Sequence, residues 1–185
     1  KTINLHPINI SDIEDILNLN AQELTEEFKR LFHGRGGLYE GWKNITIDSI
    51  DTILSVAFYS EVEQEEALMK TLQKFIKSTR HSTIVLQRRY LKGHPGEVLV
   101  GELPNEPYVV ENGIKIKLNL LSNRNSGYFP DMKNGRVFVK ENAKDKSVLN
   151  LFSYTCAFSL AAINGGAKTV SNIDMSKGAL STGRA

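Results

Sequence analysis

The sequence contains one cysteine, Cys156, and no cluster of histidines. A single thiol cannot build an intramolecular disulfide framework or a multi-cysteine zinc site. The four histidines are too far apart in the sequence to show the spacing of metal ligands; they are His6, His33, His81 and His94. We therefore expect no bound metal.

Long apolar runs are also absent. No stretch approaches the roughly 20 uncharged apolar residues that a membrane helix needs, and the first residues lack the basic-then-apolar pattern of a secretory signal. The sequence thus predicts a protein of the cytoplasm. Its 185 residues, 41% apolar and 24% charged, fit one ordinary globular domain or two small ones.

A strong charge of one sign is missing too. The formal net charge of +2 is too small to indicate a nucleic-acid-binding protein by itself. Basic residues nevertheless gather in the middle of the chain: Lys77, Arg80, His81, Arg88, Arg89, Lys92 and His94. Two interpretations stay open, an ordinary solvated surface, which we favour, and a patch that contacts phosphates.

The first hundred residues have the pattern of a small α+β unit. Ser11 to Glu14 has the spacing of a capping box, and the apolar residues after it recur at helical intervals, which predicts a helix over 11–33, interrupted near 18–20. The glycines of 34–37 are interpreted as the end of that helix and a turn, not as a phosphate-binding loop. The further elements expected are strands at 45–50, 52–58, 83–87 and 98–101, and a helix at 61–78 with Ala67, Leu68, Leu72, Phe75 and Ile76 inward.

A hairpin follows. Asn112-Gly113 is a turn signal between the β-like run Tyr108–Val110 and the alternating run Ile114–Leu120. We expect two domains, an α+β accessory unit at 1–105 and a second domain at 106–185.

The C-terminal part has the pattern of a β-α-β unit. It comprises a strand at 148–151, a helix at 156–164 and a strand at 169–173 that ends on Asp174, with Ser176 as the cap of a further helix. In open parallel sheets a ligand binds at the carboxyl ends of the strands, where an acid can accept hydrogen bonds from ribose hydroxyls. Asp174 is thus a candidate nucleoside-binding residue.

The loop after the first of these strands bears on which cofactor could bind. A dinucleotide site needs glycines to bring backbone against a pyrophosphate, but residues 150–158 contain no glycine. NAD and FAD are therefore disfavoured. S-adenosylmethionine has no phosphate, and a loop with Ser153, Tyr154 and Thr155 can wrap its amino-acid tail.

Two segments carry a family resemblance: Val148-Leu149-Asn150-Leu151-Phe152-Ser153-Tyr154-Thr155-Cys156-Ala157-Phe158-Ser159 and Ile173-Asp174-Met175-Ser176-Lys177-Gly178-Ala179-Leu180. They resemble motifs I and II of class I S-adenosylmethionine-dependent methyltransferases similar to the bacterial 23S rRNA methyltransferases of the RlmI and RlmK type. Upstream, 127–136 is similar to that family's Gly-aromatic-aromatic-x-Asp-x-Arg-x-x-Arg segment. The resemblance covers roughly 97–185 well and the earlier part more loosely.

The resemblance implies an α/β fold class: an N-terminal α+β accessory unit followed by the first part of a Rossmann-like class I methyltransferase fold. It also implies that the segment after Arg136 is a helix, although Val137-Phe138-Val139 favours a strand by propensity. Cys156 stands where the family usually has glycine, and Lys133 where arginine is common. We interpret Cys156 as a packed residue at a helix start and not as a nucleophile.

The resemblance further assigns roles to single residues. Asp174 would hold the ribose hydroxyls, Met175 would lie along the adenine, and Phe152, Ser153, Tyr154 and Thr155 would wrap the methionine moiety. Asp131, Lys133 and Arg136 would close over the cofactor carboxylate or the substrate edge. Structural alternatives stay open: Asp174 as a helix cap, Arg136 paired with a surface acid, and Tyr128 and Phe129 as core aromatics.

The implied function is S-adenosylmethionine-dependent methylation, with a base of ribosomal RNA as the acceptor and RNA as the partner. The alternative is a catalytically inactive methyltransferase-like module that binds RNA or a protein. In the family the catalytic groups follow the fourth strand, so we expect them beyond Ala185 and expect the sequence to be a fragment of a longer protein. A homodimer through the exposed sheet edge stays open.

Overall fold

The computed structural model describes residues 7–122 and 125–184, which form two compact units. The N-terminal unit comprises residues 7–107 together with 119–122. The C-terminal unit comprises 108–118 and 125–184. The segment 119–122 belongs with the first unit, where the carbonyl of Leu121 accepts a 2.7 Å hydrogen bond from the amide of Gly96.

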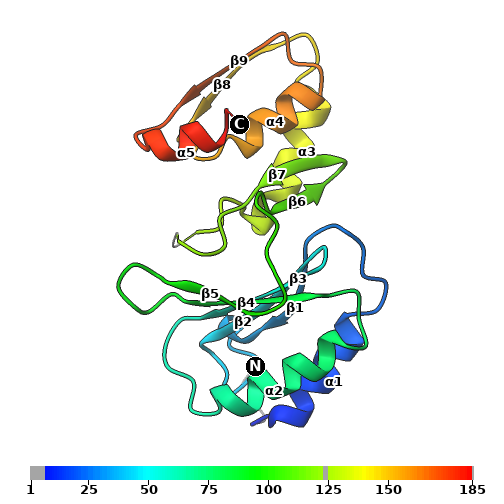
Figure 1. Ribbon diagram of the computed structural model, residues 1–185. Helices are drawn as coiled ribbons and strands as arrows, with labels where there is room; N and C mark the ends of the chain where they lie inside the picture. Colours follow the sequence, from blue (N-terminus) through cyan, green and yellow to red (C-terminus); the bar gives the residue numbers. More distant parts are fainter. Residues whose placement is uncertain (1–6, 123–124, 185) are drawn as a thin grey trace, which may run out of the picture. The chain divides into compact units, whose positions relative to one another are not determined.

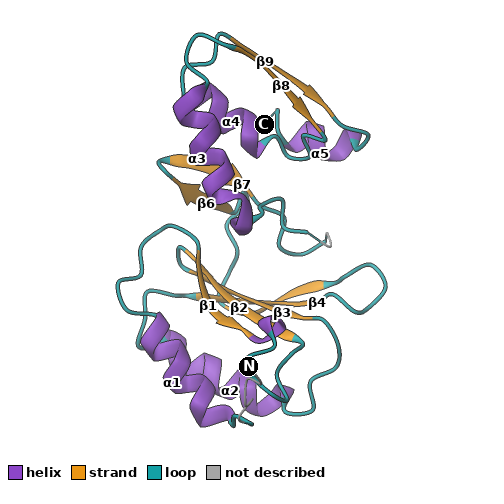
Figure 2. Cartoon of the chain, turned by 180° about the vertical axis from the view of Figure 1, so that it is seen from behind, coloured by secondary structure: helices purple, strands orange, loops and turns teal. Residues whose placement is uncertain are grey.

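The N-terminal unit is a five-stranded sheet with two helices on one face (Figures 1 and 2). Its strands follow sequence order across the sheet. All neighbours are antiparallel except β3 and β4, which are parallel and joined through α2. The elements are α1 (Ile10–Asn20), β1 (Lys29–His33), β2 (Ile45–Ile50), β3 (Ile53–Phe58), α2 (Glu65–Ile76), β4 (Thr83–Arg88) and β5 (Gly96–Val100).

One apolar core lies between this sheet and its helices. Phe32, Phe58 and Phe75 are among its largest fully buried side chains. The helix predicted at 61–78 is confirmed as α2 with narrower bounds. Of the residues expected to face inward, Ala67 is exposed. Leu68 and Leu72 are fully buried, since residues four apart share one helix face.

The predicted helix over 11–33 is wrong beyond Asn20. The cap is Asn9, whose side chain accepts from the amide of Asp12, whereas a box beginning at Ser11 was expected. Residues 29–33 form β1 and pair with β2 through a register shift between Arg30 and Phe32. This bulge lets the consecutive Leu31 and Phe32 both be buried, a pattern that resembles helical spacing in the sequence.

The glycine-rich segment therefore follows a strand and not a helix. Gly34–Gly36 forms a short 3-10 turn, η1. A Cβ at Gly34 would lie 1.8 Å from the carbonyl oxygen of Trp42, so the chain passes too close there for any side chain.

The C-terminal unit contains a hairpin and a parallel strand pair. Its elements are β6 (Tyr108–Glu111), β7 (Ile114–Lys117), η2 (Pro130–Met132), α3 (Lys133–Asn142), β8 (Ser147–Leu151), α4 (Ala157–Asn164), β9 (Thr169–Ile173) and α5 (Lys177–Thr182). The hairpin, the β-α-β unit and the helix across Val137–Val139 are confirmed. Leu151 pairs with Ile173, so both parallel strands end at the same edge of the sheet.

None of the helices in the described parts of the chain, 7–122 and 125–184, is long and apolar enough to cross a membrane.

Candidate functional site

The loop between β8 and α4 has an unusual backbone. Phe152, Tyr154 and Cys156 all have left-handed conformations, with φ of 54°, 47° and 63°. A left-handed backbone conformation costs a residue other than glycine on the order of 1–3 kcal/mol, and such residues concentrate at ligand sites. The intervening Ser153 donates its amide to the carbonyl of Ile173 at 3.1 Å, which ties the loop to the end of β9.

Asp174 joins this loop to the following helix. One carboxylate oxygen accepts from the amide of Tyr154 at 2.8 Å and the other from the amide of Ser176 at 2.7 Å. These hydrogen bonds, first that from Ser176 and then that from Tyr154, lower the pKa of Asp174. A carboxylate offers about four lone-pair directions, so an ionised Asp174 keeps acceptor capacity beyond the two amides.

The alternative role of Asp174 as a helix cap is met only in part. The cap of α5 is Ser176, as predicted, and its hydroxyl accepts from the amide of Ala179 at 3.2 Å. Asp174 accepts the amide of Ser176, just before α5, and also that of Tyr154 in the loop between β8 and α4. Its carboxylate therefore organises the whole edge where the two strands end.

The polar side chains of the loop have different surroundings. Thr155 is buried and donates its hydroxyl to the carbonyl of Gly127 at 2.6 Å. The hydroxyl oxygen of Ser153 is buried and has no hydrogen-bond partner among the described residues. A buried hydroxyl without a partner costs roughly 1–3 kcal/mol, so Ser153 marks a position where a ligand atom would be stabilising.

The two apolar residues assigned to the cofactor are exposed. Phe152 is 87% exposed and Met175 is 96% exposed. Large apolar side chains at this exposure, one after each strand end, are available to a flat apolar ligand. Tyr154 is half-buried, its ring centroid lies 5.6 Å from that of Phe129, and burial, then the charge of Asp174, raise its pKa.

The segment 127–136 approaches the loop through Gly127 and Phe129, but its charged residues lie in different surroundings. Asp131 is exposed in η2, and Lys133 is half-buried at the start of α3. Arg136 is 2% exposed. Its Nε and one Nη donate to the two oxygens of Glu111, each at 2.7 Å, and that Nη also donates to the carbonyl of Phe129 at 3.0 Å.

This pairing favours the structural alternative for Arg136, with a buried acid where a surface acid was considered. Tyr128 completes the cluster by donating its hydroxyl to Glu111 at 2.7 Å, whereas Phe129 is 40% exposed and is not a core residue. Burial alone raises the pKa of Glu111, but the bonds from Arg136 and Tyr128 outweigh it and the pKa is lowered.

The sequence alone does not indicate that Glu111 belongs to this cluster. The available signal was a carboxylate at the end of an apolar strand, next to the hairpin turn, where a solvated residue is the usual expectation.

Residues 29–185 match the protein family described as S-adenosylmethionine-dependent methyltransferase. A curated relative, the ribosomal RNA large subunit methyltransferase I of Aeromonas salmonicida, is 34% identical over 152 residues, which cover 78% of this chain and 38% of that protein. The protein of the same name from Vibrio cholerae is 35% identical over 152 residues, with the same coverage.

Solved structures give the fold. A protein from Streptococcus mutans, provisionally described as a SAM-dependent methyltransferase, matches with a TM-score of 0.79 and 24% identity over 97% of this chain and 48% of that one. The expected fold class, with a Rossmann-like part, is thereby confirmed. The chain spans 38% of the length of these two curated relatives.

Proposed function

The chain belongs to the family of S-adenosylmethionine-dependent methyltransferases, and we propose that it binds this cofactor at the carboxyl ends of β8 and β9 as part of an enzyme that methylates a base in RNA. The single observation that carries the proposal is Asp174, which holds the amides of Tyr154 and Ser176 and keeps acceptor capacity for two ribose hydroxyls.

The residues of the loop fit such a cofactor. The buried hydroxyl of Ser153, which has no partner in the described part of the chain, is a candidate contact of the amino-acid tail. The exposed side chain of Met175 is placed next to Asp174 to cover an adenine face. The loop contains no glycine, which suits a cofactor without phosphates. We retain Phe152, Tyr154 and Thr155 as proposed backbone and apolar contacts of the methionine moiety, and Asp131 and Lys133 as residues at its edge.

Arg136 is a weaker candidate for direct contact. Its position in the buried pair with Glu111 supports a role in holding the segment 127–136 against the loop. We therefore propose that Arg136 acts on the cofactor through the position of Phe129 and Tyr128.

Methyl transfer needs a nucleophile held in line with the activated methyl group. S-adenosylmethionine, when bound, supplies that methyl group on a positively charged sulfur. The described residues contribute binding and orientation: Asp174 fixes the ribose, and the left-handed loop fixes the tail. The group that orients or deprotonates the acceptor is not assigned to a residue of this chain.

RNA is the proposed acceptor because the curated relatives are named as ribosomal RNA methyltransferases. We propose that 1–105 is an accessory unit that places the RNA, that 106–185 belongs to the methyltransferase domain, and that the enzyme acts in the cytoplasm. The inactive-module alternative gains no support from the family match. The suggested homodimer stays a prediction.

Isothermal titration with S-adenosylmethionine and S-adenosylhomocysteine tests the cofactor site. We expect micromolar binding that Asp174→Ala weakens at least tenfold and that Glu141→Gln, which removes an exposed acid of α3, leaves unchanged. A cofactor analogue that lacks one ribose hydroxyl should bind the native chain more weakly but bind Asp174→Ala no worse than the intact cofactor. If the native chain bound this analogue as tightly as the intact cofactor, the assignment of Asp174 to the ribose hydroxyls would be contradicted.

A further inference from the structure

A cationic surface forms at one edge of the N-terminal unit, where several strand ends meet. Tyr59 directly follows β3 and Arg89 directly follows the parallel neighbour β4, and the amide of Arg89 donates to the carbonyl of Phe58 at 2.8 Å. The amide of Tyr59 donates to the carbonyl of Asn44, just before β2, also at 2.8 Å. Arg35 reaches the same edge from η1, the turn after β1.

Two guanidinium groups gather on one aromatic ring there. The Cζ of Arg35 lies 4.0 Å from the ring centroid of Tyr59, and that of Arg89 lies 5.3 Å from it. Arg89 also donates to the hydroxyl of Tyr59 at 3.0 Å and to the side-chain oxygen of Gln87 at 2.6 Å. These neutral partners orient both cations without cancelling their charge.

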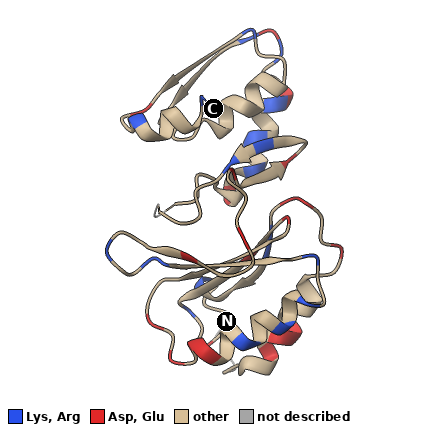
Figure 3. Ribbon diagram, viewed as in Figure 1, with Lys and Arg blue, Asp and Glu red and all other residues tan. Residues whose placement is uncertain are grey.

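Most of the other arginines of this unit have an acidic partner. Arg30 pairs with Asp48, Arg80 with Asp51, and Arg88 with both Glu65 and Glu97. Helix α1 carries only acidic charges, whereas α2 carries charges of both signs (Figure 3). Among the described residues, neither Arg35 nor Arg89 forms an ion pair, although Asp48, already held by Arg30, lies close enough for Arg89 to influence its pKa.

The basic cluster noted in the sequence therefore divides. Arg80 and Arg88 are neutralised, and His81 is buried between the hydroxyls of Thr79 and Ser49 with its pKa lowered to about 4 by burial. Lys77 and Lys92 are exposed, and Arg89 has Arg35 as its cationic neighbour, 54 residues earlier in the sequence.

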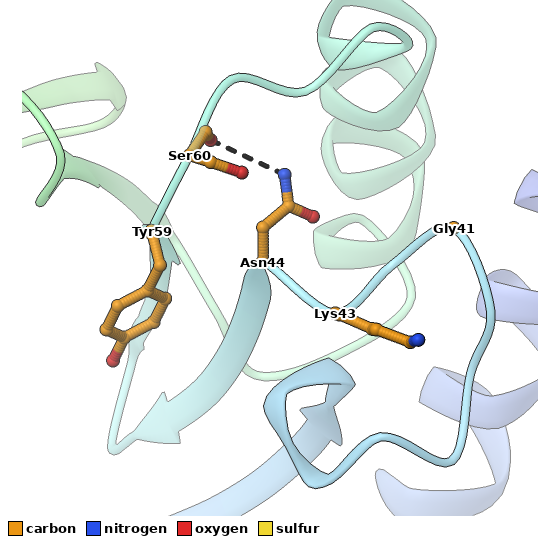
Figure 4. A pocket seen from close by; sticks show the side chains of 5 residues that line it. All are labelled: Gly41, Lys43, Asn44, Tyr59 and Ser60. Carbon is orange, nitrogen blue, oxygen red and sulfur yellow. Dashed lines mark hydrogen bonds between the residues drawn. The ribbon is translucent and has the colours of Figure 1, made fainter.

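An open pocket lies against Tyr59, the residue whose ring both arginines contact. It has a volume of about 510 Å³ and is lined by Gly41, Lys43, Asn44, Tyr59 and Ser60. Figure 4 shows Asn44 between Tyr59 and Lys43, with its amide directed to the carbonyl of Ser60. The same amide donates to the carbonyl of Glu61 at 2.6 Å, so the wall of the pocket is held in place.

We propose that Arg35, Arg89 and Lys43 bind the phosphodiester backbone of a single-stranded segment of RNA, one nucleotide of which occupies the pocket beside Tyr59. Planar guanidinium groups match phosphate oxygens, and an aromatic ring beside unpaired cations is a common feature of single-strand recognition. A volume of this size is within the range of small-molecule pockets and can hold a nucleotide. The inference rests on the proposed RNA acceptor and adds the surface that would hold it.

Fluorescence anisotropy with a labelled single-stranded oligouridine tests the proposal. We expect Arg35→Gln with Arg89→Gln to weaken binding about tenfold or more and to lower the slope of log affinity against log salt by about 1.4, because each lost phosphate contact on a single strand contributes about 0.7. Lys70→Gln with Lys77→Gln removes the same charge from exposed positions of α2 and its end and should change the affinity less than twofold.

Two further variants separate the parts of the surface. Arg35→Gln alone changes an exposed side chain and should therefore leave the fold intact. It should lower the salt slope by about 0.7. Tyr59→Leu should weaken binding about fivefold or more, because it removes both the stacking ring and the hydroxyl that orient Arg35 and Arg89.

The outcomes distinguish this surface from the cofactor site. Equal RNA affinity of the double arginine variant and the lysine control, with native cofactor binding in both, would overturn the surface and leave the cofactor proposal standing. No RNA binding by the native chain at low salt would overturn the surface and the RNA acceptor together. Tighter binding of a matched duplex would overturn the single-strand assignment.

Discussion

The two units of the molecule hold together by different means. In the N-terminal unit, the largest fully buried side chains are phenylalanines, leucines and isoleucines in one continuous core. In the C-terminal unit, strands β8 and β9 leave Leu149, Leu151 and Ile173 between 54% and 60% exposed, and the buried residues of α4 are small: Ser159, Ala161 and Ala162.

This contrast locates the candidate cofactor site on the less densely packed unit. There, order comes from backbone hydrogen bonds, from Asp174 and from the buried cluster around Glu111, because few large apolar side chains are enclosed. Polar clusters of this kind fix geometry but are costly when one member is lost. The N-terminal unit should respond mainly to changes of volume, and the C-terminal unit mainly to changes of charge.

The largest effect is expected from Arg136→Met. It leaves the buried carboxylate of Glu111 without its cation, which should cost about 3–5 kcal/mol in the free energy of unfolding of the C-terminal unit. Urea denaturation followed by hydrogen exchange of peptides from each unit measures it. Adding Glu111→Leu should recover much of the loss, since no charge then remains buried; failure to recover would mean that the pair acts by packing alone.

The second largest effect is expected from a substitution that reduces the volume of a core side chain. Leu54 is fully buried in β3, and Leu54→Ala should destabilise the N-terminal unit by about 2–5 kcal/mol because it leaves a cavity. The matched substitution Leu149→Ala, at a side chain 60% exposed, should change the C-terminal unit by about 0.5 kcal/mol or less. Equal losses at the two leucines in the same denaturation experiment would remove the contrast between the units.

Much of the C-terminal unit could be predicted from the sequence because its signals are local. The hairpin depends on Asn112-Gly113, and the β-α-β unit on short apolar runs separated by a helical pattern. The position of Asp174 at the strand end followed directly from that order. The edge where the loop and Asp174 meet was thus predicted from the residues, while the roles of single side chains there remain predictions.

What the sequence did not predict depends on contacts between distant residues. The bulge that makes 29–33 a strand exists only because β2 pairs with it, and Leu31-Phe32 alone fits a helix equally well. Glu111 and Arg136 are 25 residues apart, so neither position indicates the other. Arg35 and Arg89 come together only through the order of the strands in the sheet.

The two units should also differ in how their free energies of unfolding change as the pH falls. Burial lowers the pKa of His81 to about 4, so between the ordinary value of 6.5 and about 4 the unfolded chain binds a proton that the folded chain does not. Stability contributed by neutral His81 is complete above 6.5 and is lost as the pH falls, by roughly 1.4 kcal/mol per pH unit.

Denaturation at a series of pH values, compared with His81→Gln, isolates this effect in the N-terminal unit. The pKa values of Glu111 and Asp174 are lowered, so their contributions to the C-terminal unit are present above the ordinary carboxyl range and are lost only at lower pH. We expect the difference between the native chain and His81→Gln to vanish in peptides of the C-terminal unit. An identical pH slope in both proteins would show that His81 has the same pKa in the folded and the unfolded chain and would contradict the expectation.

The smallest effect concerns the strained loop. Cys156 has φ 63° and ψ 23° at the cap position of α4, a left-handed conformation that glycine adopts without cost. Cys156→Gly and Cys156→Ala both remove the sulfur, yet only alanine keeps a Cβ in the unfavourable region. The glycine variant should therefore be the more stable of the two by about 1 kcal/mol, although glycine costs more entropy on folding. Urea denaturation with exchange of peptides covering 152–164 measures the order, and a more stable alanine variant would show that the loop relaxes out of the left-handed conformation and does not hold the strain for a ligand.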